Sequence, residues 1–130
     1  MNRIFASLLL FCVISLVAFQ SASAVTMAWS PVGNPNNLPD STGFGAVDHS
    51  YNIGTYDVTN SQYVDFLNAN DPNGTSPLQV YNRNMSSTPF GGIAYNSGAV
   101  SGSKYSVISG DGNHPVNWVT WYDAIRFANL

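Results

Sequence analysis

Cysteine is almost absent from this 130-residue sequence, and glutamate is absent altogether. The one cysteine is Cys12, inside an apolar N-terminal segment, and residues 25–130 contain none. Residues 25–130 therefore cannot form a disulfide, a thiolate metal site or a cysteine nucleophile. The seven acidic residues are all Asp. Without Glu, no calcium loop can be closed by the bidentate glutamate that such loops use.

Positive charge is also scarce. After residue 24 the only basic side chains are Arg83, Lys104 and Arg126, which oppose the seven Asp and leave a formal charge of −4. A basic surface for nucleic acid or anionic lipid is therefore not expected. Few charges combined with many Gly, Asn, Ser and Thr residues favour a loop-rich exported domain over a cytosolic enzyme.

Long hydrophobic runs are missing except at the N-terminus. Ile4 to Phe19 is almost wholly apolar, Asn2-Arg3 precedes it, and Ala22-Ser23-Ala24 follows as a small-x-small cleavage site. This order predicts a secretory signal peptide over residues 1–24, cleaved after Ala24. The run is shorter than the roughly 20 residues that a membrane-spanning helix needs, which favours a cleaved signal peptide. A retained membrane anchor is the alternative. We expect residues 25–130 to be exported, to the periplasm, the cell surface or the medium.

Motifs for catalysis or metal binding are not found. His49 and His114 are the only histidines, and they form no zinc-binding spacing. Asp111-Gly112-Asn113 and Asn68 to Asp71 are better explained as Asx-type turns than as calcium loops. No Gly-x-Ser-x-Gly motif occurs, and Gly91-Gly92 lacks the strand-to-helix context of a phosphate loop. The sequence predicts no catalytic, cofactor-binding or metal-ligating residue.

Two helices have clear N-terminal signals. Thr59 with Gln62 forms a capping box for a helix that continues to Leu67 and fails over residues 70–74. Thr120 with Asp123 forms a second capping box, and we expect Asp123 to pair with Arg126. In that helix the apolar residues 121, 124, 125 and 128 follow the i, i+3, i+4, i+7 spacing of an amphipathic helix, and in residues 25–130 alone we expect the apolar faces of Trp121 and Ile125 to be exposed.

Short strands are expected around these helices. Alternation predicts a strand with one buried face over residues 25–30, and another over 51–53 before Gly54. Residues 91–95 and 104–108 predict two strands joined by the loop 97–103, and residues 116–119 predict one more. The sum is an α+β domain that is rich in irregular loops.

Three tryptophans allow two interpretations. The alternating or helical spacing of Trp29, Trp118 and Trp121 favours a place in the hydrophobic core. The alternative is a platform of exposed aromatic side chains that binds carbohydrate.

Two segments resemble a known family. Residues 54–66 (GTYDVTNSQYVDF) resemble the G-x-Y-E-V-T-N-x-Q-Y/F-x-x-F helix opening of the formylglycine-generating enzyme (sulfatase-modifying factor) family. Residues 114–124 (HPVNWVTWYDA) are similar to that family's H/K-P-V-x-x-V-S/T-W-Y/x-D-A segment. The two segments occur in the family's order, and the Gly43 to Val47 stretch is similar to exported bacterial members. Asp57 stands where the family usually has Glu.

The resemblance implies an irregular mixed fold related to the C-type lectins. Family enzymes oxidise a substrate cysteine to formylglycine with oxygen and with copper held by a cysteine pair, and related members use non-haem iron for sulfur oxidation. The copper and calcium sites belong to the C-terminal part of the family domain, which has no counterpart here. No catalytic residue is carried over, because the matching motifs are caps, strand edges and helix faces.

Leu130 follows a helical pattern without a C-terminal cap, so we expect residues 25–130 to be the N-terminal part of such a domain, incomplete at its C-terminus. Alone, these residues are expected to be poorly soluble or partly unfolded. Three hypotheses remain open: an exported domain without catalytic activity in this chain, a secreted lectin-like binding module, and a structural surface protein. A partner is not specified beyond protein or glycan at the cell surface.

Overall fold

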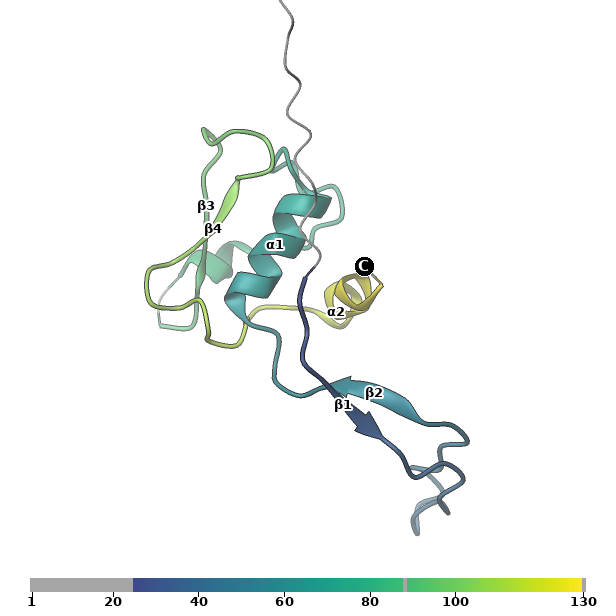
Figure 1. Ribbon diagram of the computed structural model, residues 1–130. Helices are drawn as coiled ribbons and strands as arrows, with labels where there is room; N and C mark the ends of the chain where they lie inside the picture. The colour runs from purple at the N-terminus through teal and green to yellow at the C-terminus, as the bar shows by residue number, and fades with distance from the viewer. Residues whose placement is uncertain (1–24, 88, 130) are drawn as a thin grey trace, which may run out of the picture.

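The computed structural model describes residues 25–87 and 89–129, so the expected signal peptide lies outside the described residues. Two β-strands, β1 (Trp29–Val32) and β2 (Tyr51–Gly54), form an antiparallel pair that projects away from the rest of the protein (Figure 1). The remaining elements are α1 (Asn60–Asn70), the 3₁₀ helix η1 (Arg83–Ser86), β3 (Ile93–Tyr95), β4 (Tyr105–Val107) and α2 (Trp121–Ala128). This is a small mixed fold of two helices and short strands, as the α+β prediction states.

The helix α1 begins where its capping box places it. The Thr59 Oγ1 atom accepts from the Gln62 amide at 3.3 Å, and Gln62 Oε1 accepts from the Thr59 amide at 2.9 Å. This reciprocal pair satisfies two of the backbone donors that a helix start leaves free. The helix ends at Asn70, within the turn-forming stretch that the sequence identifies as its limit.

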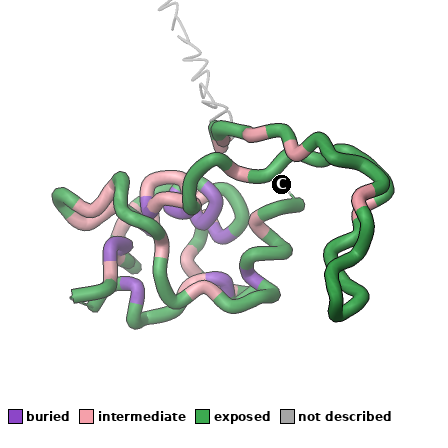
Figure 2. Tube along the Cα trace, turned by 90° about the horizontal axis from the view of Figure 1, so that it is seen from below, coloured by how far each residue is buried: buried purple, intermediate pink, exposed green. Residues whose placement is uncertain are grey.

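The hydrophobic core lies on one side of α1. The buried residues gather around this helix, and the β1–β2 pair contains none of them (Figure 2). The core residues come from α1, the loop that follows it, η1 and the β3–β4 pair, and they are Tyr63, Val64, Phe66, Leu67, Val80, Met85, Ile93 and Tyr105. Fewer than a dozen buried apolar residues make a modest core for a chain of this length.

The second antiparallel pair, β3–β4, packs on α1 through Ile93 and Tyr105 and is also hydrogen-bonded to it by one side chain. Asn68 donates to the Tyr105 carbonyl at 2.9 Å and accepts from the Tyr105 amide at 3.0 Å. The side-chain amide thus satisfies both backbone groups of a residue in the short strand β4. The predicted hairpin of residues 91–95 and 104–108 is confirmed, with Ala94 opposite Ser106.

Two glycines in this region are required by close packing. A Cβ atom at Gly91 would lie 2.2 Å from the Ser87 carbonyl oxygen, and one at Gly92 would lie 2.0 Å from Asn60 Nδ2. The Gly91-Gly92 step therefore permits η1, β3 and α1 to approach each other, which explains the pair without a phosphate-binding role.

Two predicted strands differ from the structure. The first strand begins at Trp29 rather than at Val25, because only residues 29–32 find ladder partners in β2. Residues 116–119 form no strand: Pro115 makes a single bridge to Thr59, and Trp118 has φ +63°. A left-handed residue interrupts an extended backbone, so the segment turns into α2 instead of extending this bridge into a strand.

The apolar stripe of α2 is exposed, as expected for residues 25–130 on their own. Trp121 is 75% exposed and Ile125 40% exposed, whereas Asp123 is buried and Phe127 is half-buried. The helix is turned so that Phe127 meets the α1 rings, with centroids 5.9 Å from Tyr63 and 5.4 Å from Phe66. The Asp123 carboxylate that caps the helix is therefore buried.

The three tryptophans are not core residues. Trp29, Trp118 and Trp121 are 59%, 46% and 75% exposed, which contradicts the preferred interpretation of their spacing. Spacing indicates which residues share a face, but it does not indicate whether another element covers that face. Among the described residues no helix is both long and apolar enough to cross a membrane.

Candidate functional site

An apolar groove separates the β1–β2 pair from α2. It has a volume of about 480 Å³, and we call it the hairpin groove. The strands contribute Trp29 and Ile53, while α2 contributes Ala124, Phe127 and Ala128. Its size lies in the range of ligand pockets in proteins, and its lining is mostly apolar.

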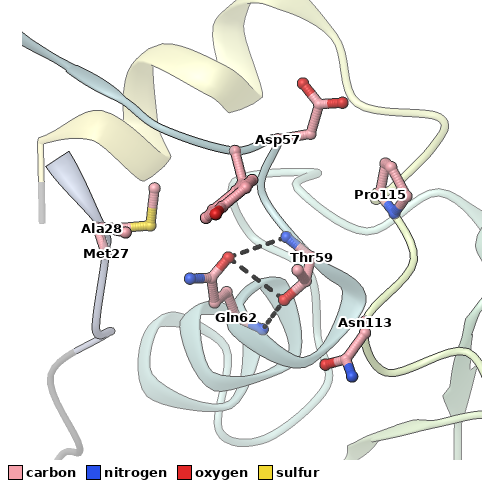
Figure 3. Close-up of a pocket in the computed structure, with 8 residues that line it drawn as sticks. Met27, Ala28, Asp57, Thr59, Gln62, Asn113 and Pro115 are labelled. Atoms are coloured by element: carbon pink, nitrogen blue, oxygen red, sulfur yellow. Dashed lines mark hydrogen bonds between the residues drawn. The ribbon is translucent and has the colours of Figure 1, made fainter. Parts of the chain in front are cut away.

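A second, more polar pocket of about 390 Å³ adjoins the groove at Met27, Tyr56 and Asp57 (Figure 3). The start of α1 forms its floor through Thr59 and Gln62. These two residues use their polar atoms on each other and on the backbone, because Gln62 Nε2 also donates to the Thr26 carbonyl at 2.7 Å. The helix N-terminus is thus already capped and offers little to an anion.

Neither of these two cavities contains the groups that acid–base or nucleophilic catalysis needs. Asp57 is the only charged residue that lines either one, and its carboxylate points away from the Thr59–Gln62 pair (Figure 3). No His, Cys, Lys or Arg lines them within the described part of the chain. A lone carboxylate lacks the partner that would activate a nucleophile or water.

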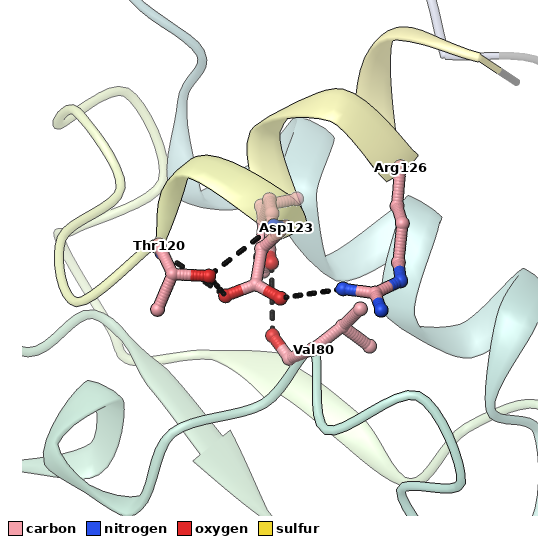
Figure 4. A network of polar contacts seen from close by, with 5 residues as sticks. Val80, Thr120, Asp123 and Arg126 are labelled. Carbon is pink, nitrogen blue, oxygen red and sulfur yellow. Dashed lines mark hydrogen bonds and ion pairs between the residues drawn. The ribbon is translucent and has the colours of Figure 1, made fainter.

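A polar network surrounds the start of α2 and has a structural role (Figure 4). Asp123 accepts from Thr120 Oγ1 at 2.6 Å and from the Thr120 amide at 3.0 Å, and Arg126 lies 3.5 Å away. Tyr63 donates to the Val80 carbonyl at 2.8 Å. Burial, and then the negative charge of Asp123, raise the pKa of the Tyr63 hydroxyl above its usual value. The predicted capping box and Asp123–Arg126 pair are both confirmed.

The two histidines contact different aspartates. His114 Nδ1 lies 3.1 Å from Asp111 Oδ1, inside the turn before Pro115, and His49 Nδ1 lies 2.5 Å from Asp48 Oδ1. Both imidazoles are largely exposed. The turn interpretation of His114 is confirmed, since its amide also donates to the Asp111 carbonyl.

Asp71 ends α1 as a buried Asx-type cap. Its carboxylate accepts from the amides of Thr75 and Ser76, each at 2.8 Å, and from the Tyr105 hydroxyl. Burial raises the pKa of the Tyr105 hydroxyl, and the hydrogen bond to the Asp71 carboxylate adds to this effect. The turn interpretation of residues 68–71 is therefore confirmed at Asp71 and wrong for residues 68–70, which belong to α1, and the oxygens of Asp71 are already engaged.

Three tyrosines form a cluster that the sequence did not indicate. The ring centroids of Tyr81, Tyr95 and Tyr105 lie 5.0–5.9 Å from one another. They border a third cavity of about 520 Å³, the tyrosine pocket, whose other lining residues are Gly74, Thr75, Ser76, Arg83 and Ser86. The tyrosines belong to three separate segments without a shared period, so no local pattern could identify them.

A comparison with known families assigns the chain. Residues 35–130 match the sulfatase-modifying factor enzyme 1-like domain, so the protein belongs to the sulfatase-modifying factor family. The resemblance of the two segments quoted above is thereby confirmed. No curated protein and no solved structure matches the chain. The relation to C-type lectins that the resemblance implies consequently stays a prediction.

The residues present do not fit the copper site of the family's oxidases. That site uses a cysteine pair, and the only cysteine of the sequence is Cys12. In residues 25–87 and 89–129, no three side chains of His, Cys, Asp or Glu gather as a metal site would require. Asp71 does not fit a calcium site either, because its carboxylate already accepts hydrogen bonds from two backbone amides and from Tyr105.

Proposed function

We propose that this chain is an exported domain of the sulfatase-modifying factor family that does not itself oxidise cysteine. One observation supports it above all: residues 25–130 contain no cysteine, so these residues have no thiolate for copper. The lining of the two cavities beside α1, with one unpaired carboxylate, agrees with a scaffold that binds rather than reacts.

Copper binding tests the non-catalytic part of the proposal. The protein recovered after export is titrated with Cu(I) against a competing chelator, beside a family oxidase that has its cysteine pair. We expect stoichiometric binding by the oxidase and none by this protein. Tight, stoichiometric Cu(I) binding by this protein would overturn the proposal, because it would reveal a copper site built without cysteine thiolates.

Export is tested on the full chain. The Asn2-Arg3 start, the apolar run and the Ala22-Ser23-Ala24 step favour cleavage after Ala24. We expect the exported protein to begin at Val25 by intact-mass measurement, and Ala24→Phe to retain the leader because a bulky residue blocks the cleavage site. An exported protein of unchanged mass would support the retained anchor instead.

A second candidate function is a secreted, lectin-like module that binds glycans. The observation that favours it is the exposure of aromatic side chains, above all Trp121 at 75% and Trp29 at 59%. Exposed aromatic rings offer an apolar face together with a polar rim, which suits sugar rings. A glycan array probed with the exported protein tests this function, and no signal above background would end it. A purely structural surface protein is the outcome in that case.

A further inference from the structure

We propose that the tyrosine pocket binds an anionic saccharide, a sugar ring that carries a carboxylate. The inference rests on the second candidate function and names its site and ligand class. The pocket lies on the β3–β4 side of α1 and shares no lining residue with the hairpin groove or with the polar pocket beside it. Its volume of about 520 Å³ is in the range of small-molecule sites.

The aromatic wall suits a sugar ring. Tyr105 is almost fully buried at 3% exposure, whereas Tyr95 is 40% exposed and leaves part of its ring open to a ligand. The hydroxyl of each tyrosine already donates: Tyr95 to the Gly74 carbonyl, Tyr81 to the Ile93 carbonyl, and Tyr105 to Asp71. A phenolic oxygen that donates can still accept, so these oxygens can receive the hydroxyl groups of a polyol.

Ser76 provides a donor without a partner. Its Oγ atom is buried and has no hydrogen-bond partner among the described residues. Ser76 also has φ +48°, an uncommon conformation for a residue other than glycine. A buried hydroxyl left unsatisfied costs about 1–3 kcal/mol, which a polar ligand would recover once the Ser76 side chain turns toward the adjoining cavity, because Oγ itself is not exposed there.

Arg83 sets the charge preference. It is the first residue of η1, lies on the wall of the pocket, and forms no ion pair within the described part of the chain. A guanidinium binds a carboxylate through two parallel hydrogen bonds. Asp71, the nearest acid by contact, is 2% exposed and is screened from the cavity by the Thr75 and Ser76 amides and by Tyr105.

The experiment compares two sugars that differ in one group. Methyl β-D-glucuronide and methyl β-D-glucoside are titrated into the ¹⁵N-labelled exported protein, and amide shifts are followed. We expect saturable binding of the glucuronide, with affinity about tenfold above that of the glucoside, which is the share of one charged contact. Absence of saturable glucuronide binding, or equal affinity for both sugars, would overturn the inference.

Variants locate the site. Arg83→Gln is expected to reduce glucuronide affinity about tenfold. Arg126→Gln, which changes the net charge equally but lies on α2, should leave it unchanged. Ser76→Ala should weaken binding of both sugars without lowering the stability of the free protein, since it removes an unsatisfied hydroxyl. Urea unfolding of each variant separates lost binding from lost folding.

The outcome separates this inference from the function it rests on. If the glycan array gives signals for neutral glycans alone, or if Arg83→Gln binds the glucuronide as the wild type does, the protein binds glycans but not in the tyrosine pocket. If neither the array nor the glucuronide gives binding, both fail. Wild-type affinity in Ser76→Ala would equally count against the pocket, because the buried hydroxyl would then have no ligand.

Discussion

Gly92 lies against the side chain of Asn60, and the contact leaves no space for another atom. A Cβ at position 92 would be 2.0 Å from Asn60 Nδ2, which donates to the Asp111 carbonyl at 2.9 Å. Asn60 is 3% exposed and begins α1, so it cannot swing aside without losing that bond. The contact joins the start of β3, the start of α1 and the turn before Pro115.

We therefore expect Gly92→Ala to destabilise the protein by about 1–3 kcal/mol, the usual cost of an overpacked site. The measurement is the urea unfolding midpoint of the exported protein. Gly33→Ala is the matched control, because a Cβ at Gly33 would meet nothing within 4 Å. Equal midpoints for Gly92→Ala and the wild type would contradict the structure at this contact.

The cap of α2 contributes more than a simple helix cap. Thr120 Oγ1 is 2.6 Å from Asp123, whose side chain is buried at the α1–α2 contact. Thr120→Ala removes the cap, worth about 1 kcal/mol, and also takes a hydrogen bond from a buried carboxylate. We expect a loss above that of Thr59→Ala, measured by denaturant unfolding. Thr120→Ser should restore most of it, and a serine variant as unstable as the alanine variant would argue against the cap.

The protein should lose stability in alkali because of two buried tyrosines. The pKa values of Tyr63 and Tyr105 are raised, mainly by burial, so the folded state keeps both protons more firmly than the unfolded state does. Their contribution is fully present below the ordinary tyrosine pKa of about 10 and is lost as pH rises above it. Unfolding free energy measured from pH 8 upward should fall, and Tyr105→Phe should make that fall shallower. The same change at Tyr122, which is 70% exposed, should have no such effect.

Residues 25–130 are expected to associate through the hairpin groove. Trp29 and Ile53 line it and are 59% and 53% exposed, an apolar surface with few charges around it. We expect a hydrophobic dye to bind and sedimentation to reveal association, with Trp29→Ser reducing both. Leu38→Ser is the control, because Leu38 is 88% exposed but lies outside the groove. An equal reduction by both variants would mean that general surface hydrophobicity is responsible.

Local signals predict the helix starts correctly, and long-range packing decides the rest. The capping boxes at Thr59 and Thr120 are encoded within four residues, so both could be predicted from sequence. That Phe127 rather than Trp121 packs against the core depends on where the α1 rings lie, which periodicity within α2 does not indicate. The left-handed Trp118 likewise has no residue-type signal, because a bulky side chain rarely adopts that conformation.

The candidate sites divide in the same way. The lack of cysteine and of paired histidines in residues 25–130 can be seen in the sequence, and it leaves these residues without thiolate or histidine-pair metal ligands. The tyrosine pocket could not be predicted from the sequence, because Tyr81, Tyr95 and Tyr105 come together only when the β3–β4 pair packs on α1, where Asn68 bonds to β4. Family membership identifies the scaffold, and the scaffold alone does not specify a ligand.

The central proposal is that this member of the sulfatase-modifying factor family carries the scaffold in residues 25–130 without the oxidase chemistry. The most direct measurement incubates the exported protein with a cysteine-containing peptide, copper and oxygen, and quantifies the peptide aldehyde by mass spectrometry, beside a family oxidase as the positive control. We predict aldehyde from the control and none above the protein-free background from this chain. Aldehyde that accumulates in proportion to the amount of this protein would contradict the account.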